Sequence, residues 1–308
     1  MQKLLAIIAI LFVCTLAGKT QPPPPQPVPT PVTSLPVGID QLTISGSGGN
    51  AVTCTTVRPW LTVKPSSPLP IIAWGNGWAG GSTAGVDVTR GYLPGLTNWS
   101  LNVNAIVIAA NERSVTAAKI KACVDFLIGL GNAASGTYSG TVDATRIGYA
   151  GHSQGGGEAV QGSAVGSNTL AIKGTVAMAP YVGSWNNLAL PKAPIFMLSG
   201  TADTVIVPGS WDPYWQRVKV GTVGGIKGLV LNGTHDSDAW GAYPDGTTMS
   251  IDDAARENFG RYQVVTENFW RKVLYSNTLA GSTLKTALQI NPPWSVVELA
   301  EVAGSFVL

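Results

Sequence analysis

The sequence predicts an α/β fold: an open, mostly parallel, doubly wound central sheet with helices on both faces. Two patterns indicate it, since short apolar runs alternate with helical stretches and the residues suited to chemistry follow the ends of those runs. The runs are continuously apolar, which is typical of parallel strands covered on both sides. We expect strands at 69–74, 105–110, 147–150, 174–179, 194–198 and 228–231, and helices at 115–130, 155–164, 211–218 and 258–275.

The earliest part of the domain is expected to form an antiparallel edge. Residues 38–45 and 51–59 are predicted as its two strands. No internal repeat is visible, and 308 residues are enough to bury one large core. We therefore expect a single domain over 37–308, and a monomer.

Composition and charge exclude several classes of function. Charged residues make up 12% of the chain, where roughly 25% is usual, and the net charge is +2. No basic cluster is interleaved with aromatic residues, so nucleic-acid binding is not expected. The two histidines stand in unrelated segments and no Cys or carboxylate cluster has ligand spacing. Neither a metal nor another cofactor is therefore expected.

The first residues have the pattern of an export signal. Lys3 precedes an apolar stretch, 4–17, that is too short to cross a bilayer. We expect a signal peptide over 1–18, no transmembrane segment, and a protein that is secreted or periplasmic. Cys14 lacks the small residue that precedes a lipidated cysteine. Residues 19–36 are predicted as a proline-rich linker, with a proline-recognition ligand as the alternative.

Export makes the cysteines interpretable. If Cys14 leaves with the signal peptide, Cys54 and Cys123 remain, and an oxidising compartment favours a disulfide between them. Cys54 lies in an expected strand and Cys123 in an expected helix. The alternative is two buried thiols.

Residues 146–156 place Ser153 at a sharp turn between a strand and a helix. The sequence Gly-His-Ser-Gln-Gly there precedes small-residue sequence suited to a helix pressed against a sheet. In a Gly-X-Ser-X-Gly nucleophile elbow the backbone of the serine is strained, and Gly151 and Gly155 must lack side chains so that strand and helix pack closely. The turn would hold the Ser153 hydroxyl at the carboxyl edge of the sheet as a nucleophile.

A serine hydroxyl needs a general base, and the chain has two histidines to supply one. His152 lies in the elbow itself, where its side chain is expected to point away from the Ser153 hydroxyl. His235 follows the apolar strand 226–231 and is the candidate base. The alternative for His235 is a histidine in a surface loop.

The acid that orients the base is expected between the serine and the histidine in sequence. Asp203 is the first carboxylate after the buried-looking strand 193–200. Its alternative role is an Asx turn, in which the side chain bonds its own backbone. Asp212 lies farther into the loop and Asp236 too close to His235, so both are weaker candidates.

An oxyanion hole would complete the site. The Gln154 amide, directly after the nucleophile, is one expected donor. The Trp78 amide, in the glycine-rich turn 75–81 that follows the strand 69–74, is the other. The alternative for this segment is an ordinary glycine turn.

These segments together resemble the secreted α/β-hydrolases that include bacterial cutinases, polyester (PET-type) hydrolases and chlorophyllase-like esterases. The resemblance covers 37–283 and rests on the Trp-Gly-Asn-Gly-Trp turn, the elbow, the helix around Cys123, the Ala-Pro step at 179–180 and the Asp203 and His235 segments. It implies an α/β-hydrolase catalytic domain over 37–308, with Ser153, Asp203 and His235 as the catalytic triad and Trp78 and Gln154 as oxyanion donors.

The resemblance also implies an aromatic residue beside the acyl site. Tyr181 and Trp185 follow the Ala-Pro step and are its candidates, with packing at the edge of the core as the alternative. Two departures stand out, because typical cutinases have an aromatic after the first glycine of the oxyanion loop and a methionine after the nucleophile. Here the loop is Gly-Asn-Gly-Trp and the residue after the nucleophile is Gln154. Both donors are backbone groups, so these changes alter the wall facing the substrate and leave the chemistry intact.

The resemblance thus implies a secreted serine hydrolase that cleaves carboxylic esters, hydrophobic or polymeric ones included, through an acyl-enzyme intermediate. One alternative is a small-ester or dienelactone-type hydrolase. Another, of a different class, is a catalytically silent surface-binding module. Asn98 and Asn232 begin glycosylation sequons, and a glycan on Asn232 would crowd His235, so we expect a bacterial source.

Overall fold

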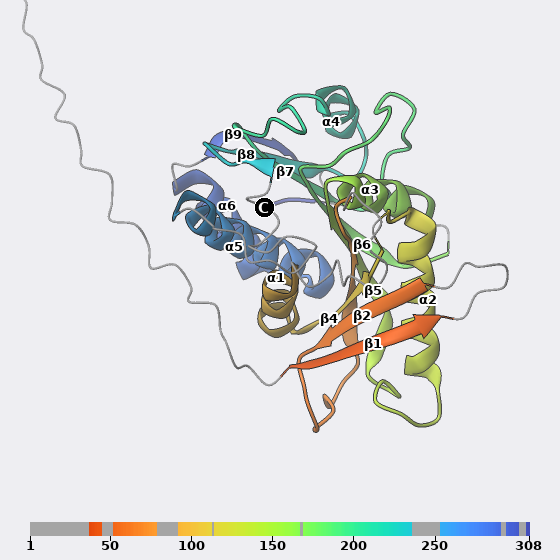
Figure 1. The fold of residues 1–308 in the computed structure, drawn as a ribbon. Helices are drawn as coiled ribbons and strands as arrows, with labels where there is room; N and C mark the ends of the chain where they lie inside the picture. Colours follow the sequence, from red (N-terminus) through yellow and green to blue (C-terminus); the bar gives the residue numbers. More distant parts are fainter. Residues whose placement is uncertain are drawn as a thin grey trace, which may run out of the picture.

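A nine-stranded sheet runs through the part of the chain that the computed structural model describes, in the order β1-β2-β4-β3-β5-β6-β7-β8-β9 (Figure 1). The described residues are 37–44, 52–78, 92–112, 114–166, 169–235, 253–290, 294–301 and 306–308. The strands are β1 Gly38–Ile44, β2 Val52–Arg58, β3 Leu69–Gly75, β4 Ile106–Ala110, β5 Val142–His152, β6 Ile172–Met178, β7 Ile195–Gly200, β8 Gly225–Val230 and β9 Trp294–Ala300. The helices are α1 Leu93–Asn98, the π-helix η2 Trp99–Asn104, α2 Ala117–Asn132, α3 Gln154–Gly166, α4 Asp212–Lys219, α5 Asp253–Tyr275 and α6 Thr278–Ile290.

The centre of the sheet is parallel and its two edges are antiparallel. Strands β4, β3, β5, β6, β7 and β8 pair in parallel. At one edge β1 and β2 pair antiparallel to each other, and β2 to β4, whereas at the other edge β9 pairs antiparallel to β8. Because parallel strands all end at the same edge, the loops after β3, β5, β6, β7 and β8 gather there.

Helices cover both faces of the sheet, with α1, α5 and α6 on one side and α2 and α3 on the other (Figure 1). Successive residues of a strand point to opposite faces. In β3, Ile72 and Trp74 therefore join the hydrophobic cluster under α1, η2, α5 and α6, while Ile71 and Ala73 join the cluster under α2. A third cluster packs α4 onto β7, on the α3 side of the sheet. The expected mostly parallel, doubly wound sheet with helices on both faces is confirmed.

The predicted central strands and the antiparallel β1–β2 edge are confirmed, with ends shifted by a few residues. Elements α1, η2, α6 and β9 were not predicted from the sequence. Strand β9 is partly exposed along most of its length and carries a glutamate, Glu298, so it lacks the continuous apolar run that marked the other strands. Helix α1 is short and contains Gly95, which lowers helix propensity.

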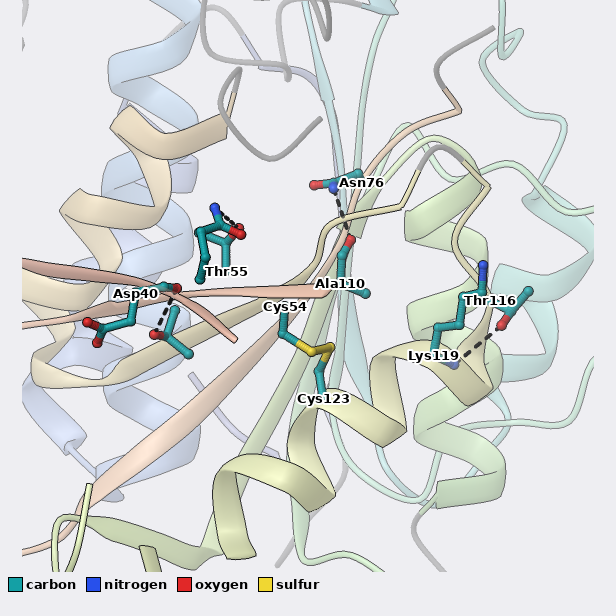
Figure 2. The surroundings of a disulfide bond; sticks show 10 residues. Asp40, Cys54, Thr55, Asn76, Ala110, Thr116, Lys119 and Cys123 are labelled. Carbon is teal, nitrogen blue, oxygen red and sulfur yellow. Dashed lines mark hydrogen bonds between the residues drawn. A yellow bond between two sulfur atoms is a disulfide. The ribbon is translucent and has the colours of Figure 1, made fainter. Parts of the chain in front are cut away.

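The disulfide expected between Cys54 and Cys123 is present, with the two Cα atoms 5.9 Å apart (Figure 2). It joins β2 to α2 through two cysteines that are 69 residues apart in sequence. The helix starts at the N-cap Thr116, whose side chain accepts a hydrogen bond from the Lys119 amide (Figure 2). The predicted signal peptide, 1–18, and linker, 19–36, lie outside the described residues. No helix in the described ranges is long and apolar enough to span a membrane.

Candidate active site

Ser153 has a left-handed backbone at the turn between β5 and α3. Its φ is +51°, a conformation that costs a residue with a side chain about 1–3 kcal/mol. Backbone bonds hold the turn: the Ser153 amide donates to the Met178 carbonyl at 2.9 Å, and the Ser153 carbonyl accepts from the Tyr181 amide at 2.8 Å. The turn thus has the strained geometry that a nucleophile elbow requires.

Three glycines let β5, α3 and β3 approach one another to backbone contact. A Cβ on Gly151 would overlap the carbonyl of Gly155, and a Cβ on Gly155 would overlap the carbonyl of Gly75 in β3. The expectation that Gly151 and Gly155 must lack side chains is therefore confirmed. The close packing brings the end of β3, and the turn that follows it, against the start of α3.

His235 and Asp203 face each other from adjacent loops. His235 Nδ1 lies 2.9 Å from Asp203 Oδ2, and the two residues are only 9% and 3% exposed. The Ala202 amide donates to the Gly233 carbonyl at 2.9 Å, so the loops after β7 and β8 are joined through their backbones. A Cβ on Gly200 would overlap that same carbonyl, which means that the close approach requires a glycine there.

The two carboxylate oxygens of Asp203 have different partners. Oδ1 accepts hydrogen bonds from the amides of Val205 at 2.9 Å and Ile206 at 2.7 Å, whereas Oδ2 faces His235. Burial raises the pKa of Asp203, but the bonds from His235 and the two amides outweigh it, so the pKa lies below its usual value. The Asx turn, which was the alternative role for Asp203, and the expected contact with a histidine are both present, one on each oxygen.

Of the two weaker candidates for the acid, Asp212 has another partner in the described structure. Asp212 begins α4, and its Oδ1 accepts a hydrogen bond from Lys227 Nζ at 2.7 Å. Asp236 lies outside the described residues. Asp203 is thus the carboxylate that the described structure brings to His235.

His152 is buried beside the base and makes two hydrogen bonds through its ring. Its Nε2 lies 2.9 Å from the carbonyl oxygen of His235, and its Nδ1 lies 3.0 Å from the hydroxyl of Tyr92. The imidazole rings of His152 and His235 are 4.7 Å apart. Burial, together with the nearby His235, lowers the pKa of His152 to about 3, so its ring is neutral. The bond between the His152 ring and the His235 carbonyl holds the end of β5 against the loop that carries His235. Ser153 is the next residue of the chain, so the turn that carries it begins at this contact.

The turn after β3 lies against Ser153. A Cβ built on Gly77 would come within 3.5 Å of the Ser153 Cβ. Buried Asn76 fixes the turn, because its Oδ1 accepts from Trp74 Nε1 at 2.9 Å and its Nδ2 donates to the Ala110 carbonyl at 3.0 Å; Figure 2 shows the second bond. The role of Asn76 was not predicted from the sequence, where it could be seen only as part of a glycine-rich turn.

The two predicted oxyanion donors, Trp78 and Gln154, directly follow Gly77 and Ser153, which lie against each other. The amide of Gly77 donates to the Tyr92 hydroxyl at 3.1 Å, which leaves Trp78 as the next amide along the turn. Gln154 begins α3, and amides in the first turn of a helix have no acceptor within it. The Gln154 side chain is turned toward the loop before α2, where its Nε2 donates to Ser114 Oγ at 3.2 Å and to the Val115 carbonyl at 3.3 Å.

The two aromatic candidates for a substrate contact differ in their surroundings. Tyr181 is 55% exposed, and its backbone amide donates to the carbonyl of Ser153. Trp185 is buried, and its ring packs on Tyr214 of α4 with centroids 5.3 Å apart. Trp185 therefore occupies the position of a packing residue at the edge of the core, which was the alternative for it.

The sheet, the strained turn after β5 and the paired loops after β7 and β8 define an α/β-hydrolase fold. Residues 97–219 match the PETase family, whose description is PET hydrolase-like. The matched segment contains Ser153 and Asp203, whereas the turn at 75–78 precedes it and His235 follows it. The predicted resemblance to the cutinase and polyester-hydrolase group is confirmed, and carboxylic-ester hydrolysis is supported as the general class of activity. A search of curated proteins found no match to the chain.

Proposed function

We propose that the protein is a secreted serine esterase of the cutinase and polyester-hydrolase type, with Ser153 as nucleophile, His235 as general base and Asp203 as the acid that orients the base. The observation that carries this proposal is the His235–Asp203 contact of 2.9 Å in loops that lie against the end of β5, where Ser153 has a φ of +51°. All three residues follow carboxyl ends of parallel strands, where α/β enzymes of this fold build their sites.

The proposed reaction has two steps of acyl transfer. His235 Nε2 takes the proton of Ser153 Oγ as that oxygen attacks the ester carbonyl, and Asp203 stabilises the imidazolium through Nδ1. The amides of Trp78 and Gln154 bind the oxyanion of the tetrahedral intermediate, each such donor being worth about 3 kcal/mol. When the intermediate collapses, His235 gives its proton to the departing alcohol. Water then attacks the acyl-enzyme with His235 as base again, and Ser153 is regenerated.

Exposed apolar side chains favour a hydrophobic ester as substrate. Four of them belong to the segments that carry or contact the proposed catalytic groups: Trp78, Tyr181, Val205 and Val207, which are between 55% and 67% exposed. Trp78 follows the turn against Ser153, Tyr181 is bonded to the Ser153 carbonyl, and Val205 is bonded to Asp203. Exposed apolar side chains on the segments that carry a reactive serine and its partners suit an apolar acyl chain or polymer segment.

Secretion is part of the same proposal. The disulfide between Cys54 and Cys123 is typical of an oxidising compartment, and the sequence of residues 1–18 has the pattern of an export signal. A bacterial source and a monomeric state remain predictions from the sequence. Mass spectrometry of the exported protein would locate its first residue, which we expect to follow residue 18.

Hydrolysis of p-nitrophenyl esters from short to long acyl chains tests the activity. We expect turnover by the wild-type protein and none by Ser153→Ala, together with labelling of Ser153 by a fluorophosphonate probe. Equal rates in the two proteins would refute Ser153 as the nucleophile. A folded wild-type protein that neither turns over nor takes the label would instead favour the catalytically silent binding module.

The acyl-chain profile separates the remaining alternatives. We expect the rate to be kept or to rise from acetate to longer acyl chains, because the segments that carry the proposed catalytic groups expose apolar side chains. A sharp fall beyond the shortest esters would favour a small-ester or dienelactone-type hydrolase. Polyester films would be the next substrate to test only if the rate is kept or rises with acyl-chain length.

A further inference from the structure

A line of hydrogen bonds joins the loop after β3, the end of β5 and the loop after β8. The Gly77 amide lies 3.1 Å from the Tyr92 hydroxyl, that hydroxyl lies 3.0 Å from His152 Nδ1, and His152 Nε2 lies 2.9 Å from the His235 carbonyl. Gly77 belongs to the loop after β3, His152 ends β5, and His235 belongs to the loop after β8. Tyr92 and His152 are 5% and 3% exposed, so the line is shielded from water.

The chemistry of the two ends fixes the direction of every bond in this line. A carbonyl oxygen can only accept, so His152 Nε2 must carry the ring proton. With the ring neutral, Nδ1 is then an acceptor, and the Tyr92 hydroxyl must donate to it. The Tyr92 oxygen is left to accept from the Gly77 amide, which can only donate. All the bonds are satisfied at once in this one arrangement.

The ring of Tyr92 is itself held in place. It packs on Trp74 of β3 with ring centroids 5.1 Å apart and on His152 with centroids 5.9 Å apart. Its hydroxyl therefore reaches the Gly77 amide and His152 from a fixed position.

We propose that His152 and Tyr92 are positioning residues, which hold the main chain of the base, His235, at a set distance from the oxyanion turn and the nucleophile. This inference rests on the proposed esterase function. Acyl transfer requires the base, the serine oxygen and the oxyanion donors to meet within hydrogen-bond reach, and a displacement of about 1 Å costs about a hundredfold in rate. Because the His152 ring is neutral, it also adds no charge next to the imidazolium that forms on His235.

The tautomer of His152 tests the arrangement without any activity assay. The chain has two histidines, so the nitrogen NMR spectrum of protein labelled at histidine shows two imidazoles. The set of signals that is lost in His152→Gln belongs to His152, and the set that remains belongs to His235. At pH 8 we expect His152 with a protonated Nε2 and a bare Nδ1. A protonated Nδ1 would overturn the proposal, since Tyr92 could not then donate to it.

Tyr92→Phe tests the effect on catalysis, with Tyr149→Phe as the matched control. Both variants lose one buried tyrosine hydroxyl, but that of Tyr149 has no hydrogen-bond partner among the described residues. For p-nitrophenyl acetate we expect Tyr92→Phe to lower kcat about tenfold or more with KM within twofold, and Tyr149→Phe to change neither. A merely structural role would lower the amount of folded enzyme and leave the rate per folded molecule unchanged.

Two substitutions of His152 separate the halves of the line and serve if Tyr92→Phe does not fold. Gln places an amide N–H where Nε2 lies and can keep the bond to His235. Asn places an acceptor where Nδ1 lies and can keep only the bond to Tyr92. We expect His152→Gln to retain more of kcat than His152→Asn; the reverse order, or a Tyr92→Phe enzyme as fast as Tyr149→Phe, would overturn the positioning role alone. A wild-type protein inactive on every ester would overturn the proposed function, and this inference with it.

Discussion

The edge of the sheet at β1 and β2 and the loops at the carboxyl ends of β5, β7 and β8 are built by opposite means. At the edge, the Cys54–Cys123 disulfide joins β2 to α2, and Arg58 pairs with Asp40 at 3.0 Å. Tyr138 donates to the same carboxylate at 2.6 Å. Each of these contacts links two different segments of the fold, and none involves a residue with a positive φ.

The carboxyl-end loops instead contain features that cost stability. Ser153 is held at a positive φ, and a neutral imidazole, His152, is buried against the loop of His235. Asp203 is a buried carboxylate that remains charged because of three hydrogen bonds. The contrast indicates that stability and chemistry are separable here, so a substitution in one region should move mainly one of the two quantities.

Asp203→Asn is expected to have the largest effect, and on activity alone. The Asn oxygen can still accept from the amides of Val205 and Ile206, so the turn persists and the free energy of unfolding should change by about 1 kcal/mol or less. The Asn amide would face His235 Nδ1 with a donor, which favours the wrong tautomer, and kcat/KM should fall about 10⁴-fold.

The control for this variant is Asp212→Asn. It removes the same charge from a carboxylate that is bonded to Lys227 instead. Ester hydrolysis and urea denaturation are measured for both. If Asp203→Asn kept more than a tenth of the wild-type kcat/KM, Asp203 would not be the residue that orients the base.

Removal of the disulfide in Cys54→Ser/Cys123→Ser should lower the stability and leave the activity nearly unchanged, the reverse of Asp203→Asn. The bridge closes a loop of 69 residues, for which the loss in the free energy of unfolding is about 4 kcal/mol on the chain-entropy model. Urea denaturation measures this loss, and kcat at 20 °C should stay within about twofold because the bridge lies at the β2–α2 edge. Wild-type protein treated with a reductant should show the same loss; an unchanged midpoint there would mean that the bridge contributes nothing.

The central strands and the Ser153 elbow could be predicted because each depends on local sequence. Continuous apolar runs mark strands buried on both faces, and the elbow glycines are fixed by a turn of a few residues. Asp203 was located by its place just after β7, and the structure brings it to His235 as expected. Strand β9, half exposed at the edge, had no such local signature.

The roles of Asn76, Tyr92 and His152 could not be predicted, because their partners are set by the fold. Tyr92 meets His152, which is 60 residues away, and His152 meets the carbonyl of His235, 83 residues away. From the sequence, the His152 side chain was expected only to point away from the Ser153 hydroxyl. No local pattern indicated that the two ring nitrogens of His152 would bond to Tyr92 and to the loop of His235.

The buried His152 should make the stability of the protein depend on pH in the mildly acid range. The pKa of this ring falls from 6.5 to about 3 on folding, so between these values the unfolded chain binds more protons than the folded protein. Stability is therefore complete above pH 6.5 and is lost as the pH falls toward 3, by at most about 1.4 kcal/mol for each pH unit. The lowered pKa of Asp203 acts in the same direction at lower pH.

Urea denaturation of wild type and His152→Gln at intervals between pH 4 and 7 isolates this contribution. Both proteins keep Asp203, so the difference between their slopes belongs to His152. We expect the Gln variant to have the shallower slope over this range. Parallel slopes would show that His152 keeps an ordinary pKa when folded, and that the ring is reached by water.

Ser153→Gly should give the smallest change, and it is one that stabilises. Glycine adopts a φ of +51° without the steric cost of a side chain, a relief of about 1–3 kcal/mol, against which its extra freedom in the unfolded chain costs about 0.5–1 kcal/mol. A net gain of about 1 kcal/mol in the free energy of unfolding follows. Ser153→Ala is the matched control, because it also removes the hydroxyl but keeps the Cβ and hence the strain. If Gly and Ala gave equal stabilities, the turn would store no strain at Ser153, and the contrast between the two regions would rest on the buried His152 and Asp203 alone.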